Sequence, residues 1–251
     1  MKIDLSGQVV LVTGGSRGIG AAIVKALGGT GATIALHYRQ AQKEAEILAK
    51  NIPNVHLFQA DLADPVASRE LVPRVIDQLG GLQTLVNNAG VVVEAGLNHD
   101  PRQWQAAWEK TLQVNLIAAA SCSRKAIEHM RLNGGGRLIH IASRAAFRGD
   151  TPEYIAYAAS KAGMVAMSRS MARYYGKDEI KSFVIAPGFT RTAMAQEFID
   201  QYGEEIVRHD LALNDLTEPE DIAPTVVFMA SGLMDHATGC AVDINAGSYV
   251  R

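Results

Sequence analysis

The sequence predicts one α/β domain, residues 1–251, in which helices cover both faces of a doubly wound parallel sheet. Short apolar runs without alternating polar residues are typical of strands that are covered on both faces. These runs alternate along the chain with segments whose apolar residues recur at helical spacing. Of the 251 residues, 48% are hydrophobic, so the chain can bury a large core. No internal repeat, linker or low-complexity tract divides it.

The strands are recognised as runs rich in Val, Ile and Leu that stop at glycine or polar residues. In chain order, strands are expected at 8–13, 33–37, 55–59, 84–86, 137–141 and 182–185, with a last strand within 238–247. Right-handed crossovers between them would place their carboxyl ends at one edge of the sheet.

The helices are recognised by their apolar spacing and start signals. They are expected at 18–27, 41–51, 66–79, 100–119 and 154–175, followed by a helical, charged stretch at 193–213 and a helix from 217. Asp100 and Thr217 are the expected caps of two of them. Asn115 interrupts the apolar face of the long helical region, so it either satisfies a local backbone group or has a functional role.

A glycine-rich turn joins the first strand to the first helix, which is the context of a dinucleotide-binding fingerprint. Gly14 would permit the tight turn, Gly18 a close approach to a pyrophosphate, and Gly20 close packing of the helix. The free amides and the positive dipole end of the helix would face the phosphates. The alternative is a plain strand-to-helix turn that is rich in glycine.

The end of the second strand bears on cofactor choice. An acidic residue there would hold the ribose of NAD, but the sequence reads Tyr38-Arg39, and Arg17 lies within the glycine turn. Two guanidinium groups suit a 2′-phosphate, because arginine binds phosphate through charge-assisted hydrogen bonds. We therefore predict NADP(H). The alternative is that both arginines are solvated surface charges.

Tyr157 and Lys161 lie four residues apart, so they share one helix face. A nearby ammonium favours the phenolate and is expected to lower the pKa of the tyrosine. Such a tyrosine can act as a general acid or base near neutral pH. On its own the pair could equally be exposed helix surface.

Composition argues against several classes of protein. A net charge of -2 gives no reason to expect nucleic acid or an anionic membrane as a partner. Cys122 and Cys240 have neither metal-ligand nor disulfide spacing, so we expect no metal site and a reducing, cytoplasmic environment. The first residues lack the apolar stretch of a signal peptide.

Taken together, the motifs resemble the short-chain dehydrogenase/reductase family over about residues 8–247, and they follow the family's order. The matching residues are Thr13-Gly14 with Gly18 and Gly20, Asn87-Asn88-Ala89-Gly90, Asn115, Ser143, Tyr157 with Lys161, and Pro187-Gly188 with Thr192. The family has a Rossmann-type fold. The overall look is most similar to the 3-oxoacyl-(acyl carrier protein) reductases.

The resemblance implies a catalytic group of four residues. Tyr157 would donate a proton to the substrate oxygen, and Lys161 would lower the tyrosine pKa and bind the nicotinamide ribose. Ser143 would hold the substrate carbonyl, and Asn115 would keep a water in a proton relay. The implied cofactor contacts, beyond the arginines, are Gly14, Ser16, Gly18, Ile19, Gly20, Tyr38, Asp61, Leu62, Asn88, Ala89, Gly90, Tyr157, Lys161, Pro187, Gly188, Thr190 and Thr192.

The substrate side departs from the family pattern. Ser143 and Tyr157 are fourteen positions apart, one more than in many members, and the charged loop 144–153 between them would border the substrate. Residues 193–213 would form a substrate lid. Tyr154 cannot form the catalytic pair, because Ala158 stands four residues on; it would line the substrate mouth or begin the helix.

The resemblance favours an NADPH-dependent reductase of a ketone, with a 3-oxoacyl thioester as the first substrate. The alternatives are a dehydrogenase or reductase of a small alcohol, sugar or steroid-like ketone, and a non-catalytic NADP(H) sensor. Basic residues could dock an acidic carrier protein, or they could be solvated surface: Arg124, Lys125, Arg131, Arg144, Arg148 and Arg191. We expect a homo-oligomer, specifically a tetramer, in which the helices around 103–131 and 154–176 pack across a two-fold interface. The side chains available for this packing, unless they simply face their own sheet, are Trp104, Trp108, Met164, Met167 and Met171.

Overall fold

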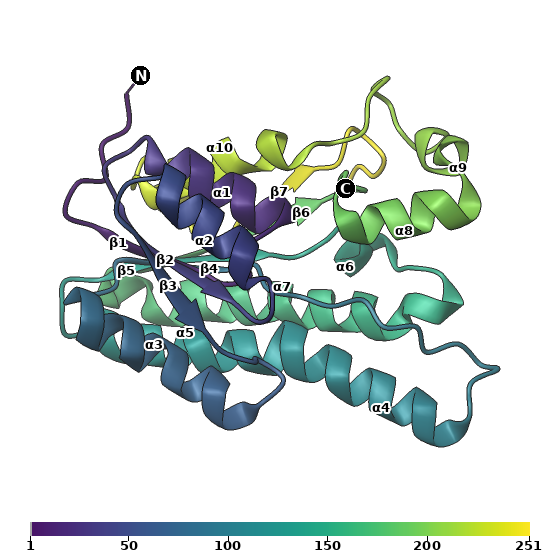
Figure 1. The fold of residues 1–251 in the computed structure, drawn as a ribbon, viewed down its shortest axis with the longest axis horizontal. Coiled ribbons are helices and arrows are strands. Elements are labelled where there is room, and N and C mark those ends of the chain that lie inside the picture. Colours follow the sequence, from purple (N-terminus) through teal and green to yellow (C-terminus); the bar gives the residue numbers. More distant parts are fainter. Residues whose placement is uncertain (1) are drawn as a thin grey trace.

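The computed structural model describes residues 2–251, and describes only the backbone of Met194, Glu197, Phe198, Gln201, Tyr202 and Ile206. A single sheet of seven parallel strands runs through the middle of the molecule in the order β3-β2-β1-β4-β5-β6-β7 (Figure 1). The strands are β1 (Val9–Val12), β2 (Thr33–Tyr38), β3 (Val55–Gln59), β4 (Thr84–Asn87), β5 (Gly136–Ile141), β6 (Ile180–Pro187) and β7 (Ala241–Ile244). This confirms the predicted fold class.

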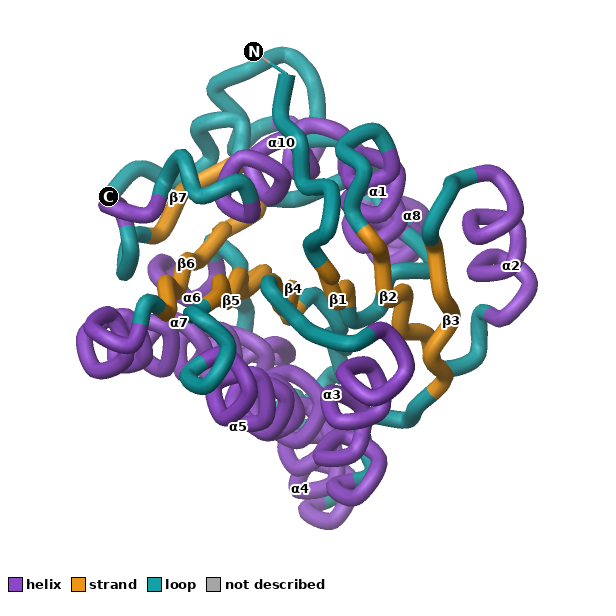
Figure 2. Tube along the Cα trace, turned by 90° about the vertical axis from the view of Figure 1, so that its left-hand side faces the viewer, coloured by secondary structure: helices purple, strands orange, loops and turns teal. Residues whose placement is uncertain are grey.

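Helices cover both faces of this sheet (Figure 2). One face carries α1 (Gly18–Gly28), α2 (Gln42–Asn51) and α10 (Pro219–Ala230), and the other carries α3 (Pro65–Leu79), α4 (Pro101–Leu112), α5 (Ala118–Met130) and α7 (Ile155–Tyr175). The short helix α6 (Ala145–Arg148) follows β5, and α8 (Ala193–Tyr202) and α9 (Glu204–Arg208) follow β6.

Two hydrophobic cores result from this layering. Residues that alternate along the central strands point to opposite faces: Val10 and Val12 pack with α1 and α10, whereas Leu11 packs with α3 and α5. All of these strand side chains are fully buried or nearly so. Burial on both faces explains why the strands lack the alternating pattern of a one-sided sheet.

The strand register brings the predicted motifs to one edge of the sheet. Val12 pairs with Val86, Asn87 with His140, and Ile141 with Ile185. The glycine turn, the Asn-Asn-Ala-Gly segment, Ser143 and Pro187-Gly188 therefore follow neighbouring strands at the same end. In an open α/β sheet this is the end at which ligands bind.

The structure corrects four local predictions. The long helical region is not one α-helix, because a π-helical turn (Gln113–Ile117) separates α4 from α5. Strand β6 is longer than predicted at both ends, and α6 was not predicted. Asp100 caps α4 as expected, through a 2.9 Å bond from the Arg102 amide. Thr217, in contrast, is not a cap: α10 is capped by Glu218, whose amide donates to Asp221.

Among the helices that the structure describes, none is long and apolar enough to cross a lipid bilayer. Among the described side chains, His, Cys, Asp and Glu nowhere gather in groups of three that could hold a metal ion.

Candidate active site

The turn between β1 and α1 has the backbone shape that the glycines allow. Gly14 has φ +64°, which disfavours other residues. A Cβ on Gly20 would overlap the carbonyl oxygen of Gly14, so the helix can pack this closely only because Gly20 lacks a side chain. The predicted roles of these two glycines, a tight turn and close packing, are confirmed.

Thr13 and Asn88 hold this turn against the end of β4. The Thr13 hydroxyl accepts hydrogen bonds from the amides of Asn88 (2.9 Å) and Ala89 (3.0 Å). The Asn88 side chain donates to the carbonyl oxygens of Thr13 (2.8 Å) and Gly14 (3.1 Å). The Asn88 amide is therefore committed to the protein backbone, so we expect the 88–90 segment to contact a cofactor through its backbone.

His37 is a positioning residue that the sequence analysis did not identify. Its Nδ1 accepts a hydrogen bond from the Gly14 amide (3.0 Å), so its Nε2 carries the proton and donates to the Ala60 carbonyl (3.1 Å). Burial lowers the pKa of His37 to about 4 and keeps the ring neutral. A histidine at the end of an otherwise apolar strand was the only signal in the sequence.

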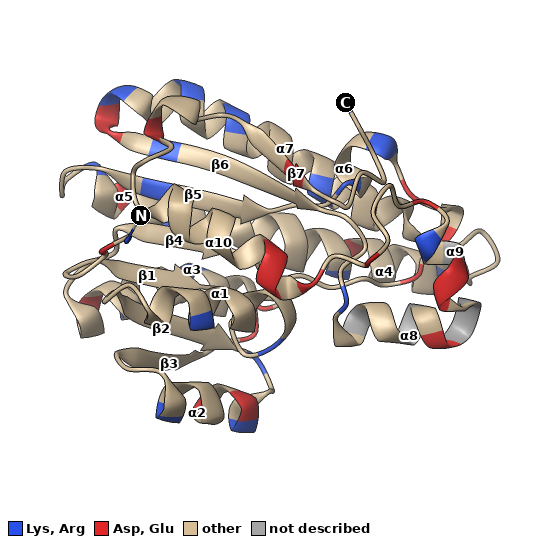
Figure 3. Cartoon of the chain, turned by 90° about the horizontal axis from the view of Figure 1, so that it is seen from above, with Lys and Arg blue, Asp and Glu red and all other residues tan. Residues whose placement is uncertain are grey.

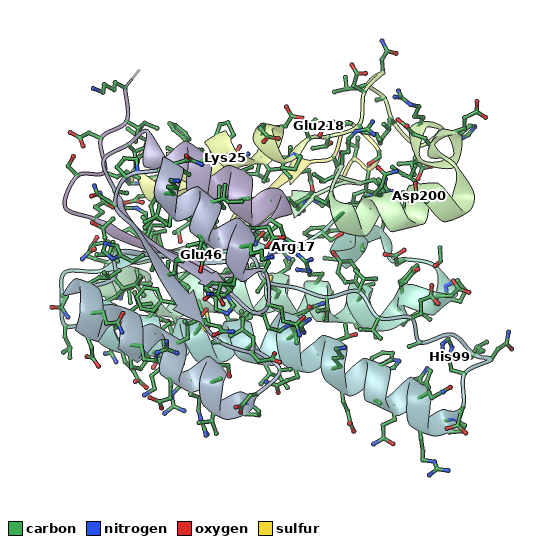
Figure 4. All side chains as sticks on the ribbon, viewed as in Figure 1. Arg17, Lys25, Glu46, His99, Asp200 and Glu218 are labelled. Carbon is green, nitrogen blue, oxygen red and sulfur yellow. The ribbon has the colours of Figure 1, made fainter. Side chains whose placement is uncertain are left out.

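The residues around the start of α1 fit an anionic dinucleotide. No side chain caps the first turn of α1 and no acidic residue lies in it, so its amides can bind phosphate oxygens. Arg17, at the cap position, and Arg39, after β2, are both exposed. Arg17 precedes the first residue of α1 and is labelled near the centre of the view in Figure 4. The Arg39 guanidinium touches Gln40 (3.1 Å) rather than a carboxylate.

The other residues that were predicted to contact the cofactor near the start of α1 differ in how exposed they are. Tyr38 is buried, with 7% of its surface exposed, whereas Asp61 is exposed and binds the Ala63 amide (2.9 Å). Ser16 and Leu62 are buried, and Ile19 packs against the core.

Asn115 lies in the π-helical turn and is fully buried. Its Oδ1 accepts from the Val91 amide (2.8 Å), and its Nδ2 donates to the Val91 carbonyl (2.9 Å) and to the Ser160 hydroxyl (3.1 Å). Such π-helical turns are frequent at functional sites. Asn115 thus satisfies the backbone groups of Val91, as the structural interpretation expects, and it joins the segment after β4 to the helix that carries Tyr157. Its place in a proton relay stays a prediction.

Lys161 is buried beside this segment. Its Nζ donates to the Ile141 carbonyl at the end of β5 (2.8 Å), and burial lowers the pKa of its ammonium to about 8. A Cβ placed on Gly90 would lie 3.5 Å from this Nζ and 3.3 Å from Asn115 Oδ1. The backbone of Gly90 therefore lies close to both side chains.

Tyr157 lies next to Ser143 and Lys161. The Lys161 ammonium is 5.7 Å from the centre of the tyrosine ring. Burial raises the pKa of Tyr157 to about 12, and a hydrogen bond with Ser143 acts in the opposite direction. The predicted net lowering of this pKa is therefore wrong for this structure, because desolvation of the phenolate outweighs the hydrogen bond with Ser143, and the nearby Asp150 charge raises the pKa further.

The segments after β5 and β6 complete the site. Ser143 accepts from the Ala145 amide (3.1 Å), and the Thr192 hydroxyl caps α8 by accepting from Ala195 (3.3 Å). A Cβ on Gly18 would lie 3.2 Å from the Thr192 methyl, so α8 starts against the glycine turn. The Thr190 hydroxyl donates to the Gly188 carbonyl (3.2 Å).

Two further sequence predictions can be located. Pro187, the last residue of β6, accepts from the Arg144 amide (2.8 Å), so β6 supports the loop that follows Ser143. Tyr154 stands at the entry of α7, where its hydroxyl donates to Glu94 (3.0 Å). That contact agrees with its predicted place at the start of the helix.

This fold and site define a dinucleotide-binding oxidoreductase of the Rossmann type. A family model described as "short chain dehydrogenase" matches residues 8–203. The chain is 31% identical to the 3-oxoacyl-[acyl-carrier-protein] reductase of Staphylococcus aureus strain Mu50, over 96% of this chain and 97% of the relative. The chain belongs to the short-chain dehydrogenase/reductase family, and it is an NAD(P)-dependent oxidoreductase.

Solved structures of similar proteins agree. A short chain dehydrogenase from Burkholderia cenocepacia J2315, in complex with NADP, has a TM-score of 0.89 and 34% identity, with 97% of this chain and 98% of that chain covered. A blue fluorescent protein from a metagenomic library, in complex with NADPH, has a TM-score of 0.90 and 35% identity, with 98% and 100% covered. Both proteins bind the phosphorylated dinucleotide.

Proposed function

We propose that the protein reduces a ketone to a secondary alcohol with NADPH, and that a 3-oxoacyl thioester is the first substrate class to test. The observation that carries this proposal is the group formed by Ser143, Tyr157 and Lys161 at the carboxyl edge of the sheet. A phenol hydrogen-bonded to a serine hydroxyl, 5.7 Å from a buried ammonium, can hold and protonate a carbonyl oxygen. The reductase relative from Staphylococcus supports the substrate class.

Each side chain has a distinct role in the proposed reaction. Ser143 and Tyr157 bind the substrate oxygen, and Tyr157 donates its proton to it. A phenol with a pKa of about 12 is fully protonated at neutral pH, as an acid must be. When bound, the nicotinamide supplies the hydride. The Lys161 ammonium holds a ribose hydroxyl beside Gly90, and Asn115 keeps the segment around Val91 in place.

NADPH is the proposed cofactor because of Arg17 and Arg39. Both guanidinium groups are exposed near the carboxyl end of β2, and neither forms an ion pair with a described carboxylate. A 2′-phosphate would satisfy them through charge-assisted hydrogen bonds. Arg17→Ala and Arg39→Ala are expected to weaken NADPH binding far more than NADH binding, and equal losses for both cofactors would contradict the assignment.

We also propose a homotetramer that packs α4, α5 and α7 across a two-fold axis. Trp104 supports this, since it is 40% exposed and stacks on Trp108 at a ring distance of 5.3 Å. The methionines do not: Met164 is fully buried, and Met167 and Met171 pack against the protein's own cores. Sedimentation velocity of the wild type and of Trp104→Glu tests the assembly, and a monomeric wild type would contradict it.

The function is tested by following oxidation of NADPH, and separately of NADH, with a panel of ketones that includes acetoacetyl-CoA. We expect turnover with NADPH and a much lower kcat/KM with NADH. Turnover of acetoacetyl-CoA above the simple ketones would support the thioester class. Tight binding of NADPH without turnover of any ketone would contradict the proposed reaction.

A further inference from the structure

Arg144 follows Ser143 directly, and its guanidinium has a buried nitrogen without a hydrogen-bond partner. Its side chain is only 14% exposed, and its Nη1 is shielded from solvent without a hydrogen-bond partner. The nearest carboxylate oxygen, on Asp210, lies 3.7 Å from Nη1, which is beyond a hydrogen bond. A buried charged donor without a partner is costly. An anion that comes within hydrogen-bond distance of this Nη1, as Asp210 does not, would therefore be bound favourably.

Asp210 is shared between two arginines. Its Oδ2 accepts a hydrogen bond from Arg148 Nη1 (2.9 Å), while Arg144 stands further off. Both arginines belong to the loop between Ser143 and Tyr157, whereas Asp210 comes from the segment after α9. The Asp210 carboxylate thus connects the lid to the loop between Ser143 and Tyr157. Movement of the lid would withdraw this carboxylate from the two arginines.

Two other charged groups act on Arg144 besides Asp210, namely Arg148 and Asp150. Arg148 and the Asp210 carboxylate both act on Arg144, and burial lowers the pKa of the Arg144 guanidinium. Asp150, on the same loop, binds the Thr151 amide (2.9 Å), and its charge acts on Tyr157. Asp150 also acts on Arg144 and Arg148, but it belongs to the same loop as the two arginines, whereas Asp210 is contributed by another segment.

We propose that Arg144 and Arg148 bind a carboxylate of the ketone substrate, and that Asp210 occupies their subsite in the absence of substrate. This inference rests on the proposed ketone reduction and adds the substrate's charge. Guanidinium groups suit the planar geometry of a carboxylate and can bind it in a bidentate manner. The substrate would be a keto acid, or a 3-oxoacyl chain that ends in a carboxylate.

The matched substrates are 4-oxopentanoate and its methyl ester, which share the ketone and chain length and differ in the charge and one methyl group. In the wild type with NADPH, we expect kcat/KM for the acid to exceed that for the ester by about tenfold or more, since a charge-assisted pair is worth at least that factor. Arg144→Gln should bring this ratio close to one, chiefly through KM of the acid. Asp210→Asn should raise the ratio, because the competing carboxylate is gone.

Asp200→Asn is the control, because it removes the same charge from α8 of the lid, where Asp200 is exposed and accepts a hydrogen bond from Gln196. It should leave the acid-to-ester ratio unchanged. An acid-to-ester ratio near one in the wild type would overturn the proposal, as would a ratio that Arg144→Gln leaves unchanged.

A binding measurement distinguishes failure of the proposed anion subsite from failure of the proposed ketone reduction. With NADP⁺ in place of NADPH, so that no hydride can be transferred to the ketone, 4-oxopentanoate should raise the melting temperature of the wild type more than that of Arg144→Gln, and the methyl ester should raise both equally. If the acid binds in this way but is not reduced, the reductase proposal fails and the anion subsite stands. If the acid stabilises neither protein, the subsite is overturned whatever the turnover of other ketones.

Discussion

The cofactor half of the site and the lid half are held together by different interactions. Around the glycine turn, Thr13, His37 and Asn88 form buried or half-buried hydrogen bonds between neutral groups. Around α8 and α9, a small apolar cluster of Ile199, Val207 and Leu216 is accompanied by ion pairs of Arg191 with Glu204 (3.0 Å) and with Glu218 (2.9 Å). Figure 3 shows acidic and basic residues close together on α9 and in the neighbouring loops.

This difference has a physical consequence. Breaking a buried hydrogen-bond network leaves unsatisfied polar groups in a low-dielectric interior, whereas exposed ion pairs contribute little and are screened by salt. We therefore expect the cofactor half to be preformed, and the ion pairs of the lid half to rearrange at low cost around its small apolar cluster. Binding of the dinucleotide would need little adjustment, while the substrate would select its lid position.

Replacing the proposed acid should have the largest effect. Tyr157→Phe removes the hydroxyl that donates the proton and keeps the ring, so we expect kcat to fall by about a thousandfold. Affinity for NADPH, measured by fluorescence titration, should change little, because the cofactor half is untouched. A variant that retains a large part of its kcat would show that another group supplies the proton.

The next effect tests the rigidity of the cofactor half. Asn115→Ala removes the three hydrogen bonds to Val91 and Ser160, so we expect a loss of roughly 2–3 kcal/mol of stability and a roughly tenfold lower kcat. Ser123→Ala is the control: it removes a buried bond from Asn87 outside the site. Ser123→Ala should lower stability without lowering kcat. Equal losses of kcat in both variants would make Asn115 a merely structural residue.

Acid should destabilise the fold through His37. Its pKa is about 4 in the folded protein and 6.5 ordinarily, so the unfolded chain binds more protons between these values. The contribution of His37 to the free energy of unfolding is thus fully present above pH 6.5 and falls as the pH drops towards 4. At most about 3 kcal/mol of this free energy is lost through His37. His140, whose pKa burial lowers to about 3, acts in the same direction.

Urea unfolding at pH 7 and pH 5 measures this effect. His37→Gln should reduce the difference in free energy of unfolding between the two pH values, whereas the same change at the exposed His56 should not. An undiminished pH difference in His37→Gln would contradict the role given to the histidine.

The smallest effect is expected in the lid. Arg191→Gln breaks both ion pairs of this exposed residue, so we expect no measurable change in melting temperature. KM for the ketone should instead become less sensitive to salt, because fewer lid contacts are electrostatic. A clear fall in melting temperature would mean that the lid is as rigid as the cofactor half.

The sequence predicted those parts of the fold that local patterns determine. Buried strands such as Val9–Val12 consist of uninterrupted apolar residues, and motif residues directly follow their ends, so the sheet and the grouping of Ser143 with Tyr157 could be anticipated. The π-helical turn could not, because its five residues have no distinctive composition. It is recognised only from the backbone of the folded chain, in which the Ala118 amide donates to the carbonyl of Gln113, five residues earlier.

The sequence predicted less of the electrostatics, since these depend on burial. The ammonium of Lys161 was expected to dominate the pKa of Tyr157, but the desolvation of both groups is a property of the packed interior. The bridge from Asp210 to Arg148 joins residues 62 positions apart across a lid whose position no local pattern specifies. The role of His37 was missed because a single buried histidine gives no indication of its partner.

Transfer of label from the cofactor tests the central claim most directly. The protein is given NADPH that carries deuterium at the transferable position of nicotinamide C4, together with its best ketone, and the product is analysed by mass spectrometry and NMR. We predict one deuterium on the carbinol carbon and a solvent-derived proton on its oxygen. Oxidation of the cofactor without deuterium in an alcohol product would contradict the assignment of this site as a ketone reductase.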